Sequence, residues 1–153
     1  AIVGLASSGV HANGFSLVRR VFKKPQIRRL SRQLLVPTRI YVKPVLAALR
    51  SVLIHAIAHV TGGGLARRLG ALTTGHRDLR ARLLPESWPV PRVFRTIQQA
   101  GRIHPVEMAR TFNMGIGMVF AIRPNSLDLA RKLLPEVKLI GEIVGGRREV
   151  VLN

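Results

Sequence analysis

Hydrophobic positions recur along the chain at two spacings, one typical of strands and one typical of helices. Residues 1–6 form an apolar run that ends at Ser-Ser-Gly, and residues 54–60 alternate apolar with polar positions, so both segments predict strands. Further strands are predicted at residues 79–84, 113–122, 137–144 and 149–152. Helical spacing predicts helices at residues 15–22, 27–35, 41–49, 92–99, 105–111 and 126–134, and another from residue 65.

Prolines and small polar residues mark where several of these segments begin and end. Asn13 or Ser16 is available to cap the helix at 15–22, and residues 23–26 read as a basic link to the next helix. Pro44 falls in the first turn of the helix at 41–49, where its missing N–H is tolerated. Strands that alternate with helices predict an α/β or α+β fold, in which a layered sheet is covered by helices.

Length and composition favour one self-sufficient domain. The 153 residues are 47% hydrophobic, which is enough for a core, so residues 1–153 are expected to form a single domain. The chain contains no cysteine, which excludes disulfides and thiolate metal sites and favours a cytoplasmic location. Residues 51–66, the longest stretch without a charged side chain, are too short for a transmembrane helix, and no membrane contact is expected.

Positive charge is concentrated in the first half of the chain. The formal net charge is +18, and residues 1–77 contain 13 Lys and Arg but no Asp or Glu. Such a half cannot form salt bridges within itself. Its cations either face water or meet a polyanionic partner such as phosphate, nucleic acid or an acidic protein surface.

Three segments combine glycine with small polar residues: residues 7–14, 59–64 and 111–117. The first two lead into helix N-termini, where free N–H groups favour an anion. His11 and Asn13 can hydrogen-bond a polar substrate, and His11 can also act as an acid or base. The alternative is that His11 only caps its loop and that the glycines only form tight turns. Gly115 and Gly117 are positions where a ligand or another backbone can come close.

Other chemistries find little support in the sequence. His55 and His59 are four residues apart, which suits metal ligands on a helix, but their segment reads as a strand, so no metal site is predicted. The carboxylates are isolated, and no catalytic acid pair is visible. Trp88 and Tyr41 are the only Trp and Tyr residues, so nucleic-acid binding would depend mainly on phosphate contacts rather than on base stacking.

Five ordered blocks carry a resemblance to a known family. They are GLASSGVHANGFSLVR at residues 4–19, PTRIYVK at 37–43, AHVTGGGL at 58–65, SWPVP at 87–91 and MARTFNMGIGM at 108–118. In this order they resemble the C-terminal half of aminoimidazole ribonucleotide synthetase, the phosphoribosylformylglycinamidine cyclo-ligase family of purine biosynthesis. The resemblance spans nearly the whole chain.

The resemblance implies a fold, a reaction and partners. The fold would be an α/β (α+β) domain, distantly ferredoxin-like, that pairs with an N-terminal ATP-binding domain in a homodimer. The reaction would use ATP and Mg²⁺ to close formylglycinamidine ribonucleotide, a phosphorylated ribonucleotide, to aminoimidazole ribonucleotide. Most ATP and metal contacts would come from the N-terminal half, which is expected to be absent here, so this chain alone is expected to be inactive.

The resemblance also implies residue roles, although it assigns no catalytic residue. Arg39 would contact phosphate or the other domain. The substrate-binding residues would be Ser7, Ser8, His11, Asn13, Arg39, Asn113 and Gly115. The residues that present backbone N–H groups to phosphate would be Thr61, Gly62, Gly63 and Gly64.

Two departures from the family pattern keep a second hypothesis open. Ala12 stands where the family usually has serine, and residues 66–68, Ala-Arg-Arg, replace a run that usually contains an acidic residue. A catalytically degenerate domain, kept as a basic structural or RNA-binding subunit of a ribonucleoprotein such as an organellar ribosome, would fit these changes and would lie in an organellar matrix. The enzyme hypothesis is preferred because His11, Asn13 and Asn113 are retained together.

Overall fold

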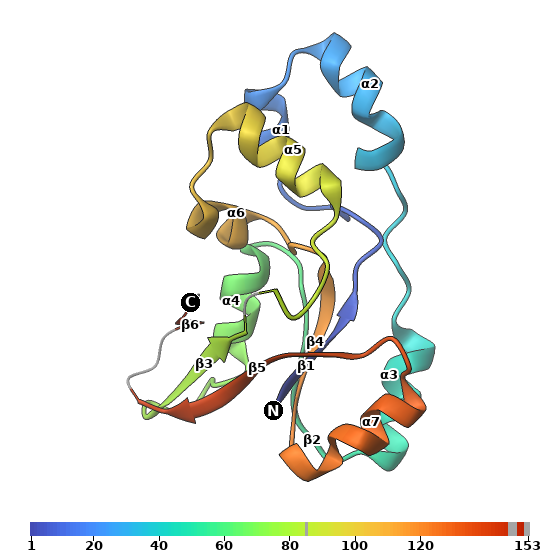
Figure 1. Cartoon of the computed structure of the whole chain (residues 1–153), viewed down its shortest axis with the longest axis vertical. Helices are drawn as coiled ribbons and strands as arrows, with labels where there is room; N and C mark the ends of the chain where they lie inside the picture. The colour runs from blue at the N-terminus through green and yellow to red at the C-terminus, as the bar shows by residue number, and fades with distance from the viewer. Residues whose placement is uncertain (85, 147–149, 152–153) are drawn as a thin grey trace.

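One mixed sheet organises the part of the chain that the structure describes, residues 1–84, 86–146 and 150–151 of this computed structural model (Figure 1). Six strands lie in the order β2-β4-β1-β5-β3-β6. Neighbouring strands are antiparallel except for β3 and β6, which are parallel. The strands are β1 (Ile2–Ala6), β2 (Ile54–His59), β3 (Leu79–Leu83), β4 (Ile116–Ile122), β5 (Lys138–Gly145) and β6 (Val150–Val151).

Helices cover both faces of the sheet and one of its ends (Figure 1). The core cluster on one face contains residues of α3 and α7, and the cluster on the other face contains residues of α4. A third cluster joins α1, α2, α5 and α6 at the end of the sheet. The helices are α1 (Phe15–Val21), α2 (Lys24–Leu34), α3 (Val42–Ser51), α4 (Gly64–Ala71), α5 (Arg92–Gly101), α6 (Pro105–Thr111) and α7 (Leu127–Leu133), with a 3₁₀ turn η1 (Pro124–Ser126).

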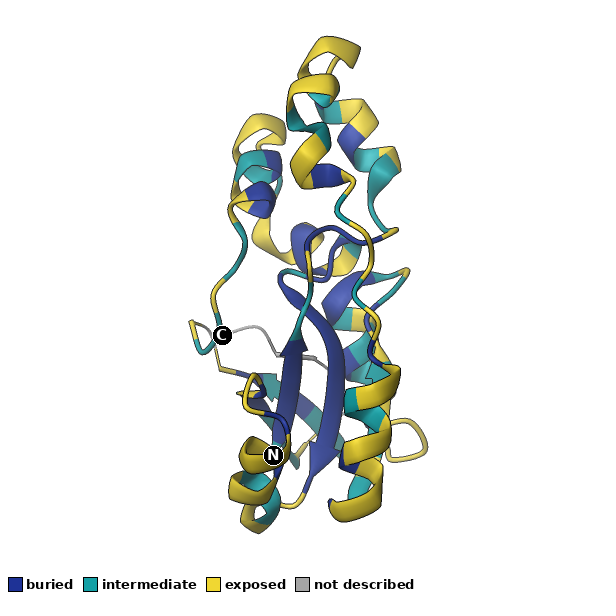
Figure 2. Cartoon of the chain, turned by 90° about the vertical axis from the view of Figure 1, so that its right-hand side faces the viewer, coloured by how far each residue is buried: buried dark blue, intermediate teal, exposed yellow. Residues whose placement is uncertain are grey.

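The strands are buried according to their position in the sheet. All seven residues of the inner strand β4 are buried, whereas β2, at the edge, alternates half-buried with exposed residues. Figure 2 shows the two inner strands in dark blue between helices whose outer surfaces are exposed. Side chains that alternate across β1 therefore serve two cores, with Val3 and Leu5 on the α3 and α7 face and Ile2 on the α4 face.

The structure confirms the predicted fold class, an α+β layered sheet, and most of the predicted elements. The predicted link at residues 23–26 is wrong, because α2 already begins at Lys24. Pro25 lies in the first turn, where its fixed φ suits a helix, and the Gln26 side chain accepts a hydrogen bond from the Lys23 N–H at 2.8 Å.

The predicted cap of α1 is also wrong. The N-cap is Gly14, with φ of 78° and no side-chain hydrogen bond, and neither Asn13 nor Ser16 caps the helix. A Cβ on Gly14 would lie 2.1 Å from the Phe112 ring, so glycine is required here by both backbone and packing. The close approach of Phe112 therefore sets where α1 begins.

Strand boundaries differ slightly from the prediction. Residues 113–115 form a turn ahead of β4 rather than the beginning of the strand, because Met114 and Gly115 both have positive φ. The predicted strand at 149–152 contains β6, while residues 149 and 152 lie outside the described residues. Among the described helices, none is long and apolar enough to cross a bilayer.

Candidate functional site

The three glycine-rich segments meet at one edge of the sheet. Because β1 and β2 both run antiparallel to β4, their carboxyl ends lie beside its amino end. The Ser7 N–H donates to the Gly115 carbonyl at 2.8 Å, and the Val60 N–H donates to the Gly117 carbonyl at 2.8 Å. The sequence segments at residues 7–14, 59–64 and 111–117 therefore form one continuous loop surface.

Asn113 holds two of these loops together from inside. The residue is buried, with 1% of its surface exposed. The amide oxygen accepts from the Ser7 hydroxyl and from the Gly115 N–H, both at 2.9 Å. The amide nitrogen donates to the carbonyls of Gly9, at 2.8 Å, and Val10, at 3.3 Å. All four hydrogen-bonding positions of the amide are thus used within the chain, which makes Asn113 a positioning residue of the loops.

His11 is buried beneath the first loop with an unusual backbone and an unpartnered nitrogen. Its φ is 58°, and its Nε2 accepts a hydrogen bond from the Ser8 N–H at 3.2 Å. The neutral ring must then carry its proton on Nδ1, which is buried and has no partner among the described residues. Burial, followed by the nearby His59, lowers the pKa of His11, so the ring is neutral at physiological pH.

Tyr41 and His59 complete a cluster of three rings around His11. The His11 ring centroid lies 6.2 Å from that of Tyr41 and 6.3 Å from that of His59. The Tyr41 hydroxyl donates to the Ala6 carbonyl at 2.8 Å, and burial raises the pKa of Tyr41 to about 12, so it remains a donor. A Cβ on Gly117 would lie 1.9 Å from the Tyr41 hydroxyl oxygen, which explains the glycine at this close approach.

The triple-glycine loop presents open backbone N–H groups. The Gly64 N–H donates to the Thr61 carbonyl at 3.0 Å, which closes a tight turn. Within the described residues the N–H groups of Gly62 and Gly63 have no such partner, and Gly62 is exposed. The Thr61 hydroxyl accepts a hydrogen bond from Arg68 at 2.6 Å, so one of the cations that depart from the family pattern lies directly against this loop.

The remaining predicted residues differ in their exposure and in their partners. Ser8 is exposed, and its hydroxyl donates to the Pro37 carbonyl at 2.7 Å. The Arg39 guanidinium lies 5.5 Å from the centroid of the Tyr41 ring and forms an ion pair with Glu136. Asn13 is half-buried in the first loop, and no described hydrogen bond joins its side chain to the network. The roles of these residues in ligand binding stay predictions.

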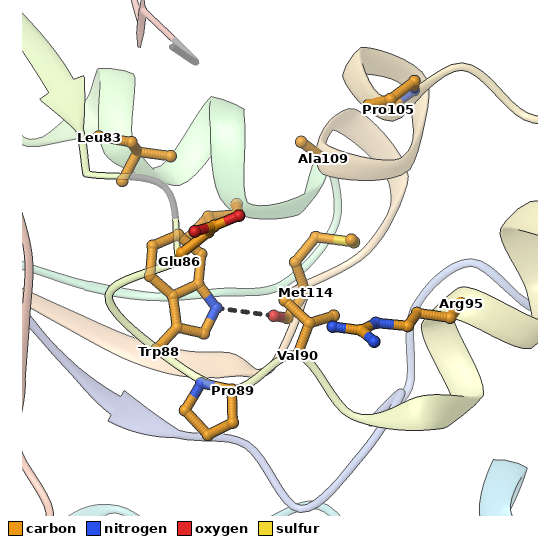
Figure 3. Close-up of a pocket in the computed structure, with 10 residues that line it drawn as sticks. Leu83, Glu86, Trp88, Pro89, Val90, Arg95, Pro105, Ala109 and Met114 are labelled. Atoms are coloured by element: carbon orange, nitrogen blue, oxygen red, sulfur yellow. Dashed lines mark hydrogen bonds between the residues drawn. The ribbon is translucent and has the colours of Figure 1, made fainter.

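A cavity of about 480 Å³ lies between α4, α6 and the segment at residues 86–91, and Met114 of the third loop is among the residues that line it (Figure 3). The Trp88 indole N–H donates to the Met114 carbonyl at 2.9 Å, as the dashed line in Figure 3 marks. The indole therefore offers the cavity an apolar face, while the charged side chains Glu86 and Arg95 also line it. Its walls suit an apolar group better than a phosphate.

Sequence reasoning did not place Tyr41 beside the three loops and considered His59 only as a metal ligand. Tyr41 lies in one of the five ordered blocks, directly before α3, which was the available signal. His59 is the last residue of β2 and thus borders the triple-glycine loop. No group of three or more His, Asp or Glu side chains in the described residues is arranged to hold a metal ion.

The fold and the gathered loops define an α+β domain that can hold a polar or anionic ligand at one edge of its sheet. The family model described as AIR synthase related protein, C-terminal domain, matches residues 1–152. The chain belongs to this family, which confirms the resemblance carried by its five sequence blocks.

Curated relatives agree with the family assignment. The chain is 40% identical over 163 residues to the phosphoribosylformylglycinamidine cyclo-ligase of Enterococcus faecalis, covering 99% of this chain and 47% of the relative. It is 44% identical to the enzyme of the same name from Caldicellulosiruptor bescii, covering 99% and 49%. It is 40% identical to the bifunctional purine biosynthetic protein ADE1 of Schizosaccharomyces pombe, covering 94% and 19%. The chain spans about half the length of the bacterial relatives.

Solved structures share the fold at low sequence identity. The hydrogenase maturation protein HypE of Escherichia coli aligns with a TM-score of 0.64 at 18% identity, covering 97% of this chain and 45% of HypE. Thiamine monophosphate kinase of Aquifex aeolicus aligns with a TM-score of 0.54 at 17% identity, covering 98% and 48%. At these identities the likeness supports the fold alone.

Replacement of Asn113 tests whether its amide holds the loops together. Asn113→Ala should lower the free energy of unfolding by about 2–4 kcal/mol, because several buried groups lose their partners. Ser7→Ala removes one of these hydrogen bonds and should cost about 1 kcal/mol. Urea denaturation of both variants measures the difference, and equal effects would contradict the central role of Asn113.

The triple-glycine loop offers a matched pair of substitutions. Gly64 has φ of 64°, and a Cβ there would lie 2.3 Å from the Ala109 carbonyl oxygen, whereas a Cβ on Gly62 would meet nothing within 4 Å. Gly64→Ala should therefore lower the unfolding free energy by about 2–4 kcal/mol. Gly62→Ala should change it by no more than about 0.5 kcal/mol. Thermal denaturation compares the two, and a costly Gly62→Ala would show that the loop is differently arranged.

Because of His11, the stability of the fold should depend on pH. The pKa of the folded chain's His11 lies below the ordinary value of 6.5, so in acid the unfolded chain binds a proton that the folded chain does not. The stabilising contribution is complete above pH 6.5 and is lost as the pH falls from there through the lowered pKa.

Urea unfolding between about pH 8 and pH 5 measures this dependence. The free energy of unfolding should decline below pH 6.5 in the unaltered chain and more gently in His11→Asn, since asparagine tolerates the left-handed backbone. Parallel pH profiles would show that His11 does not titrate as described.

Proposed function

We propose that this chain is the substrate-side domain of a phosphoribosylformylglycinamidine cyclo-ligase. The reaction would be the ATP-dependent ring closure of formylglycinamidine ribonucleotide to aminoimidazole ribonucleotide in purine biosynthesis. The γ-phosphoryl group of ATP would activate the formyl oxygen, the amidine nitrogen would attack the formyl carbon, and phosphate would leave with that oxygen. A cytoplasmic location follows from this proposed reaction.

The observation that carries the proposal is the meeting of the three glycine-rich loops at one sheet edge. It brings an open N–H pair at Gly62 and Gly63 and the ring cluster of His11 to the same surface. Open N–H groups alone are common in glycine turns, and a ring cluster alone does not indicate a ligand. Their combination in a chain that belongs to the AIR synthase related family, with relatives named as cyclo-ligases, supports a substrate phosphate at the triple-glycine loop.

The residues of this chain would contribute binding and orientation. Backbone N–H groups of Gly62 and Gly63 would donate hydrogen bonds to the ribonucleotide phosphate. The Nδ1–H of His11, which is buried and has no partner among the described residues, would donate a hydrogen bond to a substrate oxygen that enters between the loops. Its tautomer is fixed by the Ser8 N–H, and its loop is fixed by Asn113. This fixation would orient the donor before substrate binds.

ATP and Mg²⁺ would be supplied mainly by another domain. The described residues provide no cluster of acidic or imidazole side chains for a metal ion, so the site described does not fit Mg²⁺. The solved complex of a thiamine monophosphate kinase with AMPPCP, which shares the fold at 16% identity and a TM-score of 0.57, contains an ATP analogue. A partner N-terminal domain, and the homodimer that the resemblance implies, remain part of the proposal.

The alternative, a basic subunit of a ribonucleoprotein, gains no support from the relatives described above, whose names refer to purine biosynthesis. The Arg68 side chain, one of the changes that motivated it, is engaged with Thr61 of this chain. An in-chain hydrogen bond gives this arginine a local role that requires no RNA. The cyclo-ligase proposal is therefore preferred.

A cyclisation assay tests the proposal directly. This chain would be co-expressed with the N-terminal half of the Enterococcus faecalis relative, and formation of aminoimidazole ribonucleotide from formylglycinamidine ribonucleotide and ATP would be followed. We expect turnover that requires both halves. Absence of turnover by two halves that are shown to associate would overturn the proposal.

Substitution of two histidines provides the matched control for this assay. His11→Asn removes the buried ring and its Nδ1–H donor and should lower kcat by about a hundredfold, while His76→Asn, at an exposed histidine, should leave it within about twofold. Equal kcat values for the two variants would remove His11 from the proposed mechanism.

A further inference from the structure

The cavity between α4, α6 and residues 86–91 has no part in the proposed reaction (Figure 3). Its volume of about 480 Å³ lies within the range of small-molecule sites, roughly 300–1,000 Å³. Neither Gly62, Gly63 nor His11 is among the residues that line it. The cavity is therefore distinct from the place proposed for the ribonucleotide phosphate.

Most of the cavity wall is apolar. Leu65, Leu83 and Ala109 are buried, and Trp88 and Met114 are half-buried. The indole of Trp88 offers a broad flat face, and the thioether of Met114 is polarizable and packs well against aromatic rings. A wall of this kind favours a flat aromatic ring over an extended aliphatic chain.

Two contacts hold the wall in place before a ligand binds. The Trp88 N–H donates to the Met114 carbonyl at 2.9 Å, which fixes the plane of the indole. Gly115 has φ of 96°, and a Cβ there would lie 2.7 Å from Cδ of Pro91 and 3.1 Å from the Pro89 carbonyl oxygen. Both prolines thus pack closely against the third loop. A preformed wall favours binding, because less conformational entropy is lost when a ligand enters.

Two charged side chains of opposite sign line the cavity at different sides. Figure 3 shows Glu86 beside Trp88 and Arg95 beyond Val90. Both are exposed, and no described ion pair joins either of them to another side chain. A ligand with N–H donors at one end and an anionic group at the other would pair with both charges.

Hydrogen-bonding chemistry narrows the class of ligand. A carboxylate only accepts hydrogen bonds, and its two oxygens suit two adjacent donors. Guanine presents such a pair, N1–H and the 2-amino group, on one edge, whereas adenine presents its 6-amino group beside an acceptor nitrogen. The planar guanidinium of Arg95 suits a phosphate group.

We propose that this cavity binds a guanine nucleotide, with the base stacked on Trp88, the edge of the base donating to Glu86 and the phosphate paired with Arg95. The bound base would also contact Met114, which follows directly after Asn113, and would therefore lie against the third loop of the candidate site. The proposal does not depend on the proposed reaction, because binding is measured on this chain alone.

The single tryptophan of the chain provides a direct readout, since a change in its fluorescence arises at the cavity wall. Guanosine monophosphate should give a saturable change. Adenosine monophosphate should bind at least about tenfold more weakly, because it cannot donate to both carboxylate oxygens, and guanosine, which lacks the phosphate, should do the same. Isothermal titration calorimetry measures the same constants without interference from light absorbed by the base.

The high charge of the chain makes the comparison of nucleotides essential. A formal net charge of +18 attracts any anion. Equal binding of the two nucleotides would therefore indicate an adventitious anion contact only and would overturn the proposal. A titration with guanosine monophosphate that shows no saturable change would overturn it as well.

Substitutions at exposed positions test the two charged contacts. Arg95→Gln should weaken binding of guanosine monophosphate at least about tenfold and leave guanosine within about twofold. Arg92→Gln is the matched control, because it removes the same charge from an exposed position of α5 that does not line the cavity, and it should bind within about twofold of the unaltered chain. Glutamine is a good helix former, so both variants should fold.

Glu86→Gln keeps the length of the side chain and replaces one accepting oxygen by a donor. It should abolish the preference for guanosine monophosphate over adenosine monophosphate. A preference that survives this change, or equal weakening by Arg92→Gln and Arg95→Gln, would overturn the proposed contacts and with them the site.

Discussion

The amide of Asn113 makes four hydrogen bonds at the point where the first and third glycine-rich loops cross. These loops are joined to β1 and β4, which pair along the middle of the sheet. The hydrogen bonds of the amide therefore fix the positions of the two loops relative to each other, just beyond the paired strands. The amide also holds the backbone next to His11, because His11 follows directly after Val10, one of its acceptors. The tautomer of His11 is set by the Ser8 N–H of the same loop.

Glycines, which have no side chain, are also required for this arrangement. Gly117 leaves room for the Tyr41 hydroxyl and the His11 ring, and Gly64 lets α4 approach the carbonyl groups at the end of α6. A Cβ at either position would displace backbone or a buried ring, so neither close approach survives substitution without rearrangement. The glycines that look from the sequence like anion-binding loops therefore also permit the packing of the loops on one another.

Local patterns predicted elements well and caps poorly. The alternation at residues 54–60 predicted a strand, because residues that are buried on one side only alternate in the sequence itself. Its position at the edge of the sheet is seen only in the structure. The beginning of α1 depends instead on contact between Gly14 and Phe112, residues 98 positions apart in the sequence. The three loops were found by composition, but Tyr41 joined them only in the folded chain, since nothing local indicates that the residue before α3 reaches β1 and β4.

Charge places the strongest constraint on how this domain can be used. Arg39, from the half without acids, pairs across the fold with Glu136, and Arg68 turns inward to Thr61. Many other cations of this half, including Arg19, Arg20, Lys24 and Arg28 on α1 and α2, are exposed. Exposed cations attract an acidic surface, and the attraction extends over about a Debye length, roughly 8–10 Å. The charge that suggests nucleic acid from composition is therefore equally suited to an acidic protein surface.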